Sequence, residues 1–165
     1  MPATPIPKST RFYTVGRTQC YFLPTIAAAD LVPTRTELDA GTDLTREIAE
    51  MDGWSTESEK IETPDMVSRF VSSIPGAITA EDSSISFYAS ENSEDAREVF
   101  PRDTAGFIVW MDSGDVADAT MDIYPVQVAS APKVRSMDEA TLIRVDFNIT
   151  QEPVENVTIP ALAGG

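Results

Sequence analysis

The sequence predicts a mainly β protein: a β-sandwich or β-barrel of packed antiparallel sheets with one short flanking α-helix. Short segments of alternating apolar and polar residues recur along the chain and are separated by Gly, Pro, Asp and Ser. Only one segment has clear helical spacing, and strands do not alternate with helices as they do in a parallel α/β protein.

The first part of the chain predicts an arm followed by short strands. Residues 1–10 carry three prolines and little apolar bulk, so we expect a flexible N-terminal arm. Two apolar runs in residues 11–26, broken at residues 16–17, predict a hairpin or two short strands. Residues 27–45 are expected to form a polar connection with one helical turn near residues 36–40.

Residues 46–83 are acidic, rich in Thr and Ser, and poor in large apolar side chains. Two long strands joined by a polar loop around residues 63–68 fit this composition. A segment this polar is poorly suited to burial within one subunit, so we expect it to contact other subunits.

The predicted helix follows a half-buried strand over residues 84–89. Asn92 is expected to cap it, and Ala96, Val99 and Phe100 share one face at helical spacing. Pro101 is expected to end it.

The remaining strands supply most of the predicted core. The apolar run over residues 106–111 predicts a strand covered on both faces. Pro125 lies where the apolar parity switches, which predicts a bulge or bend, and residues 142–150 alternate cleanly. The predicted core residues are Ile85, Phe87, Phe107, Val109, Trp110, Ile143, Val145, Phe147 and Ile149. Residues 11–160 are therefore expected to form one β domain, followed by a flexible tail over residues 161–165.

The charge balance argues against tight nucleic-acid binding. The chain has 27 acidic and 12 basic residues, a formal net charge of -15, whereas phosphate binding needs clustered Lys and Arg. Such a surface would let DNA pass without sticking, although acidic residues also simply favour solubility. No apolar run approaches the roughly 18–20 residues of a membrane span, and the first residues have no secretory h-region, so we expect no membrane partner.

The residue types argue against an enzyme and predict no cofactor. There is no histidine, and the one cysteine, Cys20, sits in an apolar run that indicates a buried thiol. Asp112, Asp115 and Asp118 surround a glycine, which leaves open a monomeric, calcium-dependent β-sandwich binding module. The EF-hand order is absent, so a solvated turn is the preferred interpretation.

Several segments resemble the major tail tube proteins of long-tailed (siphovirus-type) phages, especially those of actinobacteria. They are GTDLTREIAEMDGW, IETPDMVSRFVSSIPG, TAEDSSISFYAS, FPRDTAGFIVW and ITQEPVENVTIP, spread over residues 36–160. The resemblance implies a virion protein with no catalytic or metal residues.

The resemblance also implies an assembly. Six copies would form a ring, strands of each subunit would join one inner barrel, and rings would stack through loops and arms. Double-stranded DNA would pass an acidic lumen without specific binding, and the tape-measure and tail-tip or terminator proteins would be partners. Assembly would take place in the host bacterial cytoplasm. From strand parity we expect Glu57, Glu59 and Asp146 to face the lumen. A tail terminator is the alternative virion ring component.

Overall fold

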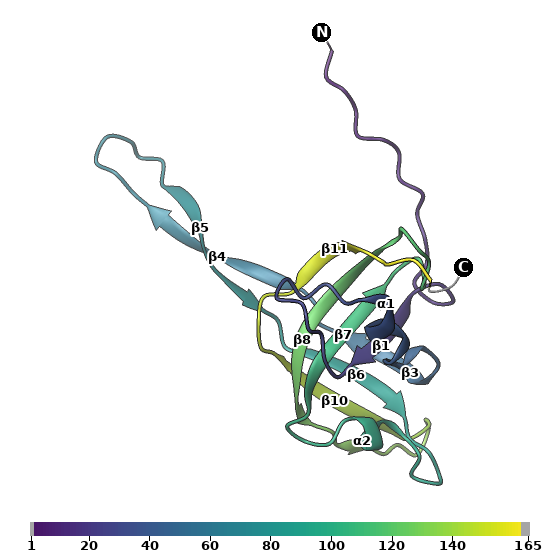
Figure 1. Ribbon diagram of the computed structural model, residues 1–165. Coiled ribbons are helices and arrows are strands. Elements are labelled where there is room, and N and C mark those ends of the chain that lie inside the picture. Colours follow the sequence, from purple (N-terminus) through teal and green to yellow (C-terminus); the bar gives the residue numbers. More distant parts are fainter. Residues whose placement is uncertain (1, 163–165) are drawn as a thin grey trace.

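A computed structural model describes residues 2–162, and it is built mainly from antiparallel strands (Figure 1). The larger sheet holds nine strands: β1 (Gln19–Leu23), β2 (Thr42–Asp43), β3 (Ile48–Asp52), β6 (Ser83–Tyr88), β7 (Ala105–Met111), β8 (Thr120–Ser130), β9 (Lys133–Val134), β10 (Leu142–Ile149) and β11 (Val154–Thr158). Its main order is β2-β1-β7-β8-β10-β6-β3, with β11 paired to β8 and β9 to β10. A second sheet contains β4 (Thr56–Thr63) and β5 (Ser72–Ala80). Within residues 2–162 the strands do not close into a barrel, so the arrangement is that of a sandwich.

The larger sheet curls so that its two halves share one core. The Phe100 ring lies 4.9 Å from the Phe22 ring of β1 and 5.6 Å from the Phe87 ring of β6, strands that are each next to an opposite edge strand of the sheet. Its centroid is also 5.3 Å from that of Phe147 on β10. Phe100 is fully buried and therefore fills the space between the two halves.

Strand β7 is covered on both faces, as its unbroken apolar run predicted. Ile108 and Trp110 belong to the main core, whereas Val109 and Met111 belong to a second core on the opposite face. The helix α1 (Arg35–Asp39) covers this second core with Leu38, at the place where one helical turn was expected. A capping box between Thr34 and Glu37 begins the helix.

The bulge expected at Pro125 is absent, because β8 pairs with β7 in continuous register through this residue, with Phe107 opposite Pro125. Both faces of β8 are covered: Met121 and Ile123 point into the second core, and Tyr124 and Val126, on the opposite face, point into the main core. Strands β10 and β11 follow one another along the same side of β8, and the Thr150 N–H donates to the Pro125 carbonyl at 3.0 Å between them.

The predicted helix is shorter than expected, and its predicted cap is wrong. Helix α2 spans Ala96–Val99, and the carboxylate of Asp95, not Asn92, accepts from the Arg97 N–H at 3.1 Å. Ser93 has φ of 63°, which keeps the chain out of the helix until Asp95. The helix ends before Pro101, as expected, and a 3₁₀ turn, η1, occupies Thr45–Glu47.

The hairpin expected in residues 11–26 is only half formed. Strand β1 is present, but Phe12, Tyr13 and Val15 lie outside any strand and are exposed. Residues 2–10, the predicted arm, are exposed and extend away from the sheets (Figure 1). The last three residues of the predicted tail lie outside the described residues.

The predicted core residues are buried with two exceptions. Phe107 and Ile149 are partly buried, because Phe107 lies at the margin of the second core and Ile149 beside an open recess. The other seven are Ile85, Phe87, Val109, Trp110, Ile143, Val145 and Phe147, and each is at most 9% exposed.

Candidate assembly surfaces

The outer face of strands β3, β6 and β10 is polar and faces away from the main core. The strand registers place its residues in three rows: Asp52, Ser84 and Asp146; Glu50, Ser86 and Arg144; and Tyr88 with Leu142. We call this the polar sheet face. Its two serines are nearly buried, because longer side chains flank them. Cross-strand neighbours on one face lie close enough to interact, so these charges act as one surface.

The polar sheet face carries net negative charge. Asp146, predicted to face the lumen, lies here and is bound by Arg144 Nε at 3.0 Å and by Ser130 Oγ at 2.9 Å. The Arg144 and Asp146 side chains are 53% and 36% exposed, so solvent screens the pair and it contributes only about 0–1 kcal/mol. Arg144 balances one carboxylate, while Glu50 and Asp52 add two more. Depressions of about 350 and 340 Å³ on this face are shallow and polar.

Strands β4 and β5 form a hairpin that projects from the body (Figure 1). It continues the pair β3–β6 across a short break, so residues 48–88 make one long hairpin. The base of this hairpin, β3 and β6, belongs to the larger sheet. Glu57 and Glu59 lie on β4 and are both exposed, and the register of β4 with β5 shifts between Ser58 and Lys60. They are therefore in a different sheet from Asp146.

Trp54 anchors the break in this long hairpin to the core. Its ring packs against those of Trp110, Tyr124 and Phe147, with centroids 5.5, 5.3 and 5.6 Å away. Its Nε1–H donates to the Ser84 carbonyl at 3.2 Å, and its own carbonyl accepts from Tyr124 Oη at 2.6 Å. Gly53 before it has φ of 81°, and a Cβ there would lie 2.4 Å from the Asp82 carbonyl oxygen.

The loop at the end of the hairpin is not polar, contrary to prediction. Met66, Val67 and Phe70 are 101%, 97% and 76% exposed, and Val71 adds to the same apolar tip. The apolar pairs Met66-Val67 and Phe70-Val71 are visible in the sequence, but the average composition of residues 46–83 is polar and conceals them. Monomeric proteins rarely expose contiguous apolar surface of this kind, so the tip is a candidate contact surface.

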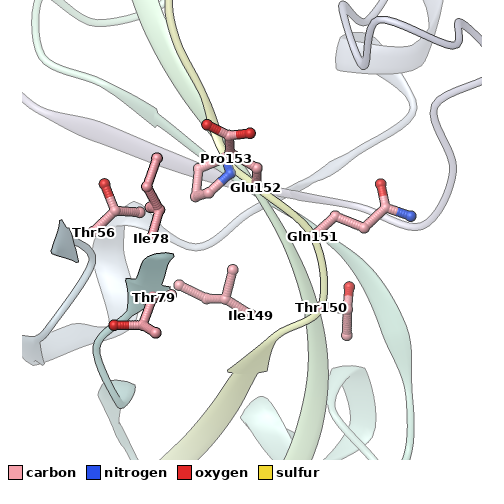
Figure 2. A pocket seen from close by; sticks show the side chains of 9 residues that line it. Thr56, Ile78, Thr79, Ile149, Thr150, Gln151, Glu152 and Pro153 are labelled. Carbon is pink, nitrogen blue, oxygen red and sulfur yellow. The ribbon is translucent and has the colours of Figure 1, made fainter. Parts of the chain in front are cut away.

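An open recess of about 270 Å³ lies where the hairpin meets the turn between β10 and β11. Figure 2 shows Ile78 and Ile149 beside Pro153, with Thr, Gln and Glu side chains around them. The recess is therefore lined by a mixture of apolar and polar side chains.

Of the three clustered aspartates, Asp115 forms an ion pair with Arg35. The Arg35 guanidinium binds both oxygens of Asp115, at 2.7 and 2.6 Å, and Tyr21 Oη donates to the same carboxylate at 3.3 Å. Arg35 lowers the pKa of Asp115, while burial and then Asp115 raise the pKa of Tyr21 to about 12. Asp112 and Asp118 remain exposed, and the described residues contain no group of three potential metal ligands. The geometry thus joins α1 to the β7–β8 turn instead of forming a calcium loop.

Cys20 is buried at 1% exposure, and burial, followed by the charge of Asp43, raises the pKa of its thiol. A protonated, enclosed thiol is a poor nucleophile. Neither helix in residues 2–162 is long and apolar enough to span a bilayer.

Solved structures share the fold. They include a sheath/tube terminator of the PVC extracellular contractile injection system in its extended state, and a chain of the sixfold-symmetrised baseplate of the anti-feeding prophage. The first has a TM-score of 0.61 at 9% identity, covering 94% of this chain and 99% of the other. The second has a TM-score of 0.54 at 10% identity, covering 96% and 100%. No curated protein matches.

A protein-family model described as phage tail tube protein matches residues 6–162, nearly the whole chain. That family consists of structural proteins and is not a class of enzymes. The chain therefore belongs to the phage tail tube protein family, and it is a structural component of the virion tail.

Proposed function

We propose that this chain forms hexameric rings that stack into the tail tube and conduct double-stranded DNA during infection. The observation that carries the proposal is the open edge of β3, which pairs with β6 alone among the described strands, beside an acidic sheet face. An unpaired edge is a template for a strand of another copy. Head-to-tail pairing around a rotation axis closes into a ring. The anti-feeding prophage assembly, whose baseplate is sixfold, supports six as the ring size.

The polar sheet face is the proposed lumen wall. Ring closure through the edge of β3 would join this face to its copies as one inner surface, with Glu50, Asp52 and Asp146 directed inward. A continuous negative wall repels phosphate and lets DNA slide. Glu57 and Glu59 would extend the negative lining beyond the body if the hairpin borders the channel.

Electron microscopy of the purified chain across a concentration series tests the assembly. We expect rings or hollow filaments with sixfold class averages. A chain that stays monomeric at every concentration, with no strand pairing between subunits, would exclude the proposal.

Charge reversal tests the lumen. Tubes of Glu50→Lys/Asp52→Lys should retain duplex DNA that wild-type tubes do not, because the inner wall would become positive. The matched control is Glu94→Lys/Glu98→Lys, which makes the same charge change beside α2. Equal DNA retention by both variants would refute the assignment of the polar sheet face to the lumen. DNA retention by tubes of Glu57→Lys/Glu59→Lys tests in the same way whether the hairpin borders the channel.

A tail terminator is the second candidate, because one structural neighbour is a sheath/tube terminator. A terminator would stop at a single ring, whereas a tube subunit would continue to stack. In either role we expect assembly in the host cytoplasm with tail-tip proteins, and for the tube also with the tape-measure protein.

A further inference from the structure

We propose that Asp52 and Gly53 form a site of spontaneous covalent modification, at which the Asp52 carboxyl closes onto the main chain and leaves an isoaspartate linkage. The site lies at the break where the projecting hairpin leaves the body (Figure 1). The reaction belongs to the single chain, so this inference does not depend on the proposed tube.

The dipeptide occurs once in the sequence. Asp52-Gly53 is the one Asp-Gly pair, and there is no Asn-Gly pair. The reaction requires the Asp carboxyl carbon to meet the next backbone nitrogen, and a Cβ on that next residue hinders the approach. Glycine has no Cβ, so it leaves the nitrogen more open than any other residue does.

The fold requires glycine at this position. Gly53 has φ of 81°, a conformation that strains residues with a side chain. A Cβ there would lie 2.4 Å from the Asp82 carbonyl oxygen and 2.9 Å from Ser83 Cα. Both are backbone atoms of the opposite strand connection, so they cannot turn aside as a side chain can. The packing that fixes glycine here also fixes the reactive dipeptide.

The two reacting groups are not held by other contacts. Asp52 is exposed, and within residues 2–162 no hydrogen bond or ion pair engages its carboxylate. In the same part of the chain the Gly53 N–H has no acceptor, whereas the Trp54 N–H donates to Ser83 Oγ at 3.1 Å. Asp52 is also the last residue of β3, which pairs with β6 alone. The end of an edge strand opens easily, so the carboxyl can reach the nitrogen.

The reaction needs no co-reactant other than water. The Gly53 nitrogen attacks Asp52 Cγ, and the carboxyl OH leaves as water with the proton from the nitrogen, which gives a cyclic succinimide. Water then opens the ring at either carbonyl carbon. Cleavage of the N–Cγ bond restores aspartate, whereas cleavage of the bond from nitrogen to the original main-chain carbonyl carbon gives isoaspartate. The main chain of isoaspartate runs through Cβ and Cγ, so it is longer by one methylene at unchanged mass.

The longer main chain acts on the anchor of the hairpin. Trp54 follows Gly53 directly, its N–H donates to Ser83 Oγ, and its carbonyl accepts from Tyr124 Oη at 2.6 Å. These contacts and the three aromatic rings around it fix the position of Trp54. The added methylene must therefore shift either the register of β3 or Trp54 itself. We expect the modification to loosen the hairpin from the body.

An isoaspartyl methyltransferase with a labelled methyl donor measures the product, and fragmentation of the labelled peptide locates it. After incubation of the purified chain at neutral pH, the label should lie mainly in the peptide that contains Asp52. Asp52→Glu should lose this label, because the longer side chain would have to close a larger, less favoured ring. Asp82→Glu, an exposed position in the other strand connection of the break, is the matched control and should keep it. Label spread evenly over other aspartates, or unchanged in Asp52→Glu, would overturn the site.

Comparison of native and denatured chains tests the contribution of the fold. The native chain should react no more than about tenfold more slowly than the chain in urea, since opening the strand end costs about one net backbone hydrogen bond. Slowing by about a hundredfold or more would show that the fold protects the pair, and it would overturn the proposal. Ageing should lower the unfolding midpoint of wild type and leave that of Asp52→Glu unchanged. An unchanged wild-type midpoint after complete modification would overturn the loosening of the hairpin.

Discussion

Truncating Trp54 to Ala should loosen the projecting hairpin from the body and destabilise the subunit. The side chain makes three edge-on or tilted aromatic contacts at 5.3–5.6 Å and one hydrogen bond to the Ser84 carbonyl. Replacing a fully buried Trp by Ala costs about 3–5 kcal/mol, and the ring here is only partly buried, so we expect about 3 kcal/mol. For a chain of this size, that corresponds to a fall in Tm of about 6–12 °C.

Denaturant unfolding measures the loss, because the midpoint falls with stability while the slope stays constant if the folded state keeps its compactness. Trp54→Phe is the matched variant: it keeps a ring in the cluster and loses the Nε1–H, so it should cost about 1 kcal/mol. Phe70→Ala at the exposed tip should change subunit stability by less than about 0.5 kcal/mol.

An unchanged midpoint in Trp54→Ala would refute the reasoning, because it would mean that the aromatic cluster does not hold the break in the hairpin. A loss equal to that of Phe70→Ala would lead to the same conclusion.

Three further predictions concern the buried ion pair, the thiol and calcium. Because Arg35 lowers the pKa of Asp115, the pair stabilises the fold above about pH 4, the usual pKa of Asp, and this contribution is lost as pH falls through the lowered folded value. Asp115→Asn should therefore cost about 2 kcal/mol at pH 7 and flatten the acid limb of a stability–pH curve, whereas an acid limb like that of wild type would contradict this. Cys20 should react with a maleimide only at the rate of unfolding, and fast labelling of the native chain would show that the thiol is open. Calcium titration should leave the Tm unchanged, since Arg35 occupies the Asp115 carboxylate; a rise in Tm with calcium concentration would restore the binding-module hypothesis.

Much of the fold could be predicted because apolar spacing reports which face of a strand is buried. The alternation in residues 142–149 and the continuous apolar run before Met111 each correspond to an observed strand. The parity switch at Pro125 misled the prediction of a bulge, because apolar residues on both faces of β8 pack into two different cores. The cap of α2 could not be placed, because Asn92 and Asp95 are both good caps and only the backbone at Ser93 distinguishes them. The apolar run around Phe12 likewise has strand-like composition, yet it finds no partner strand among the described residues.

The candidate surfaces were less accessible to prediction. The acidity of residues 46–83 was visible in the sequence, as was the resemblance to tail tube proteins. Whether Glu57 and Asp146 share a wall was not, since the sheet to which a strand belongs depends on its pairing partners. Trp54 illustrates the same limit, because its role comes from three aromatic residues more than fifty positions away in sequence.

The sequence by itself determined the β class, the buried residues of the most regular strands, the lack of histidine chemistry and the acidic character of the chain. These properties depend on residue type and on spacing along one segment. Only the tertiary structure decided that one sheet curls around Phe100, that Arg35 binds Asp115, and that the apolar tip of a long hairpin projects from the body. Each of these depends on contacts between segments far apart in the chain, and no local pattern encodes which distant segments will meet.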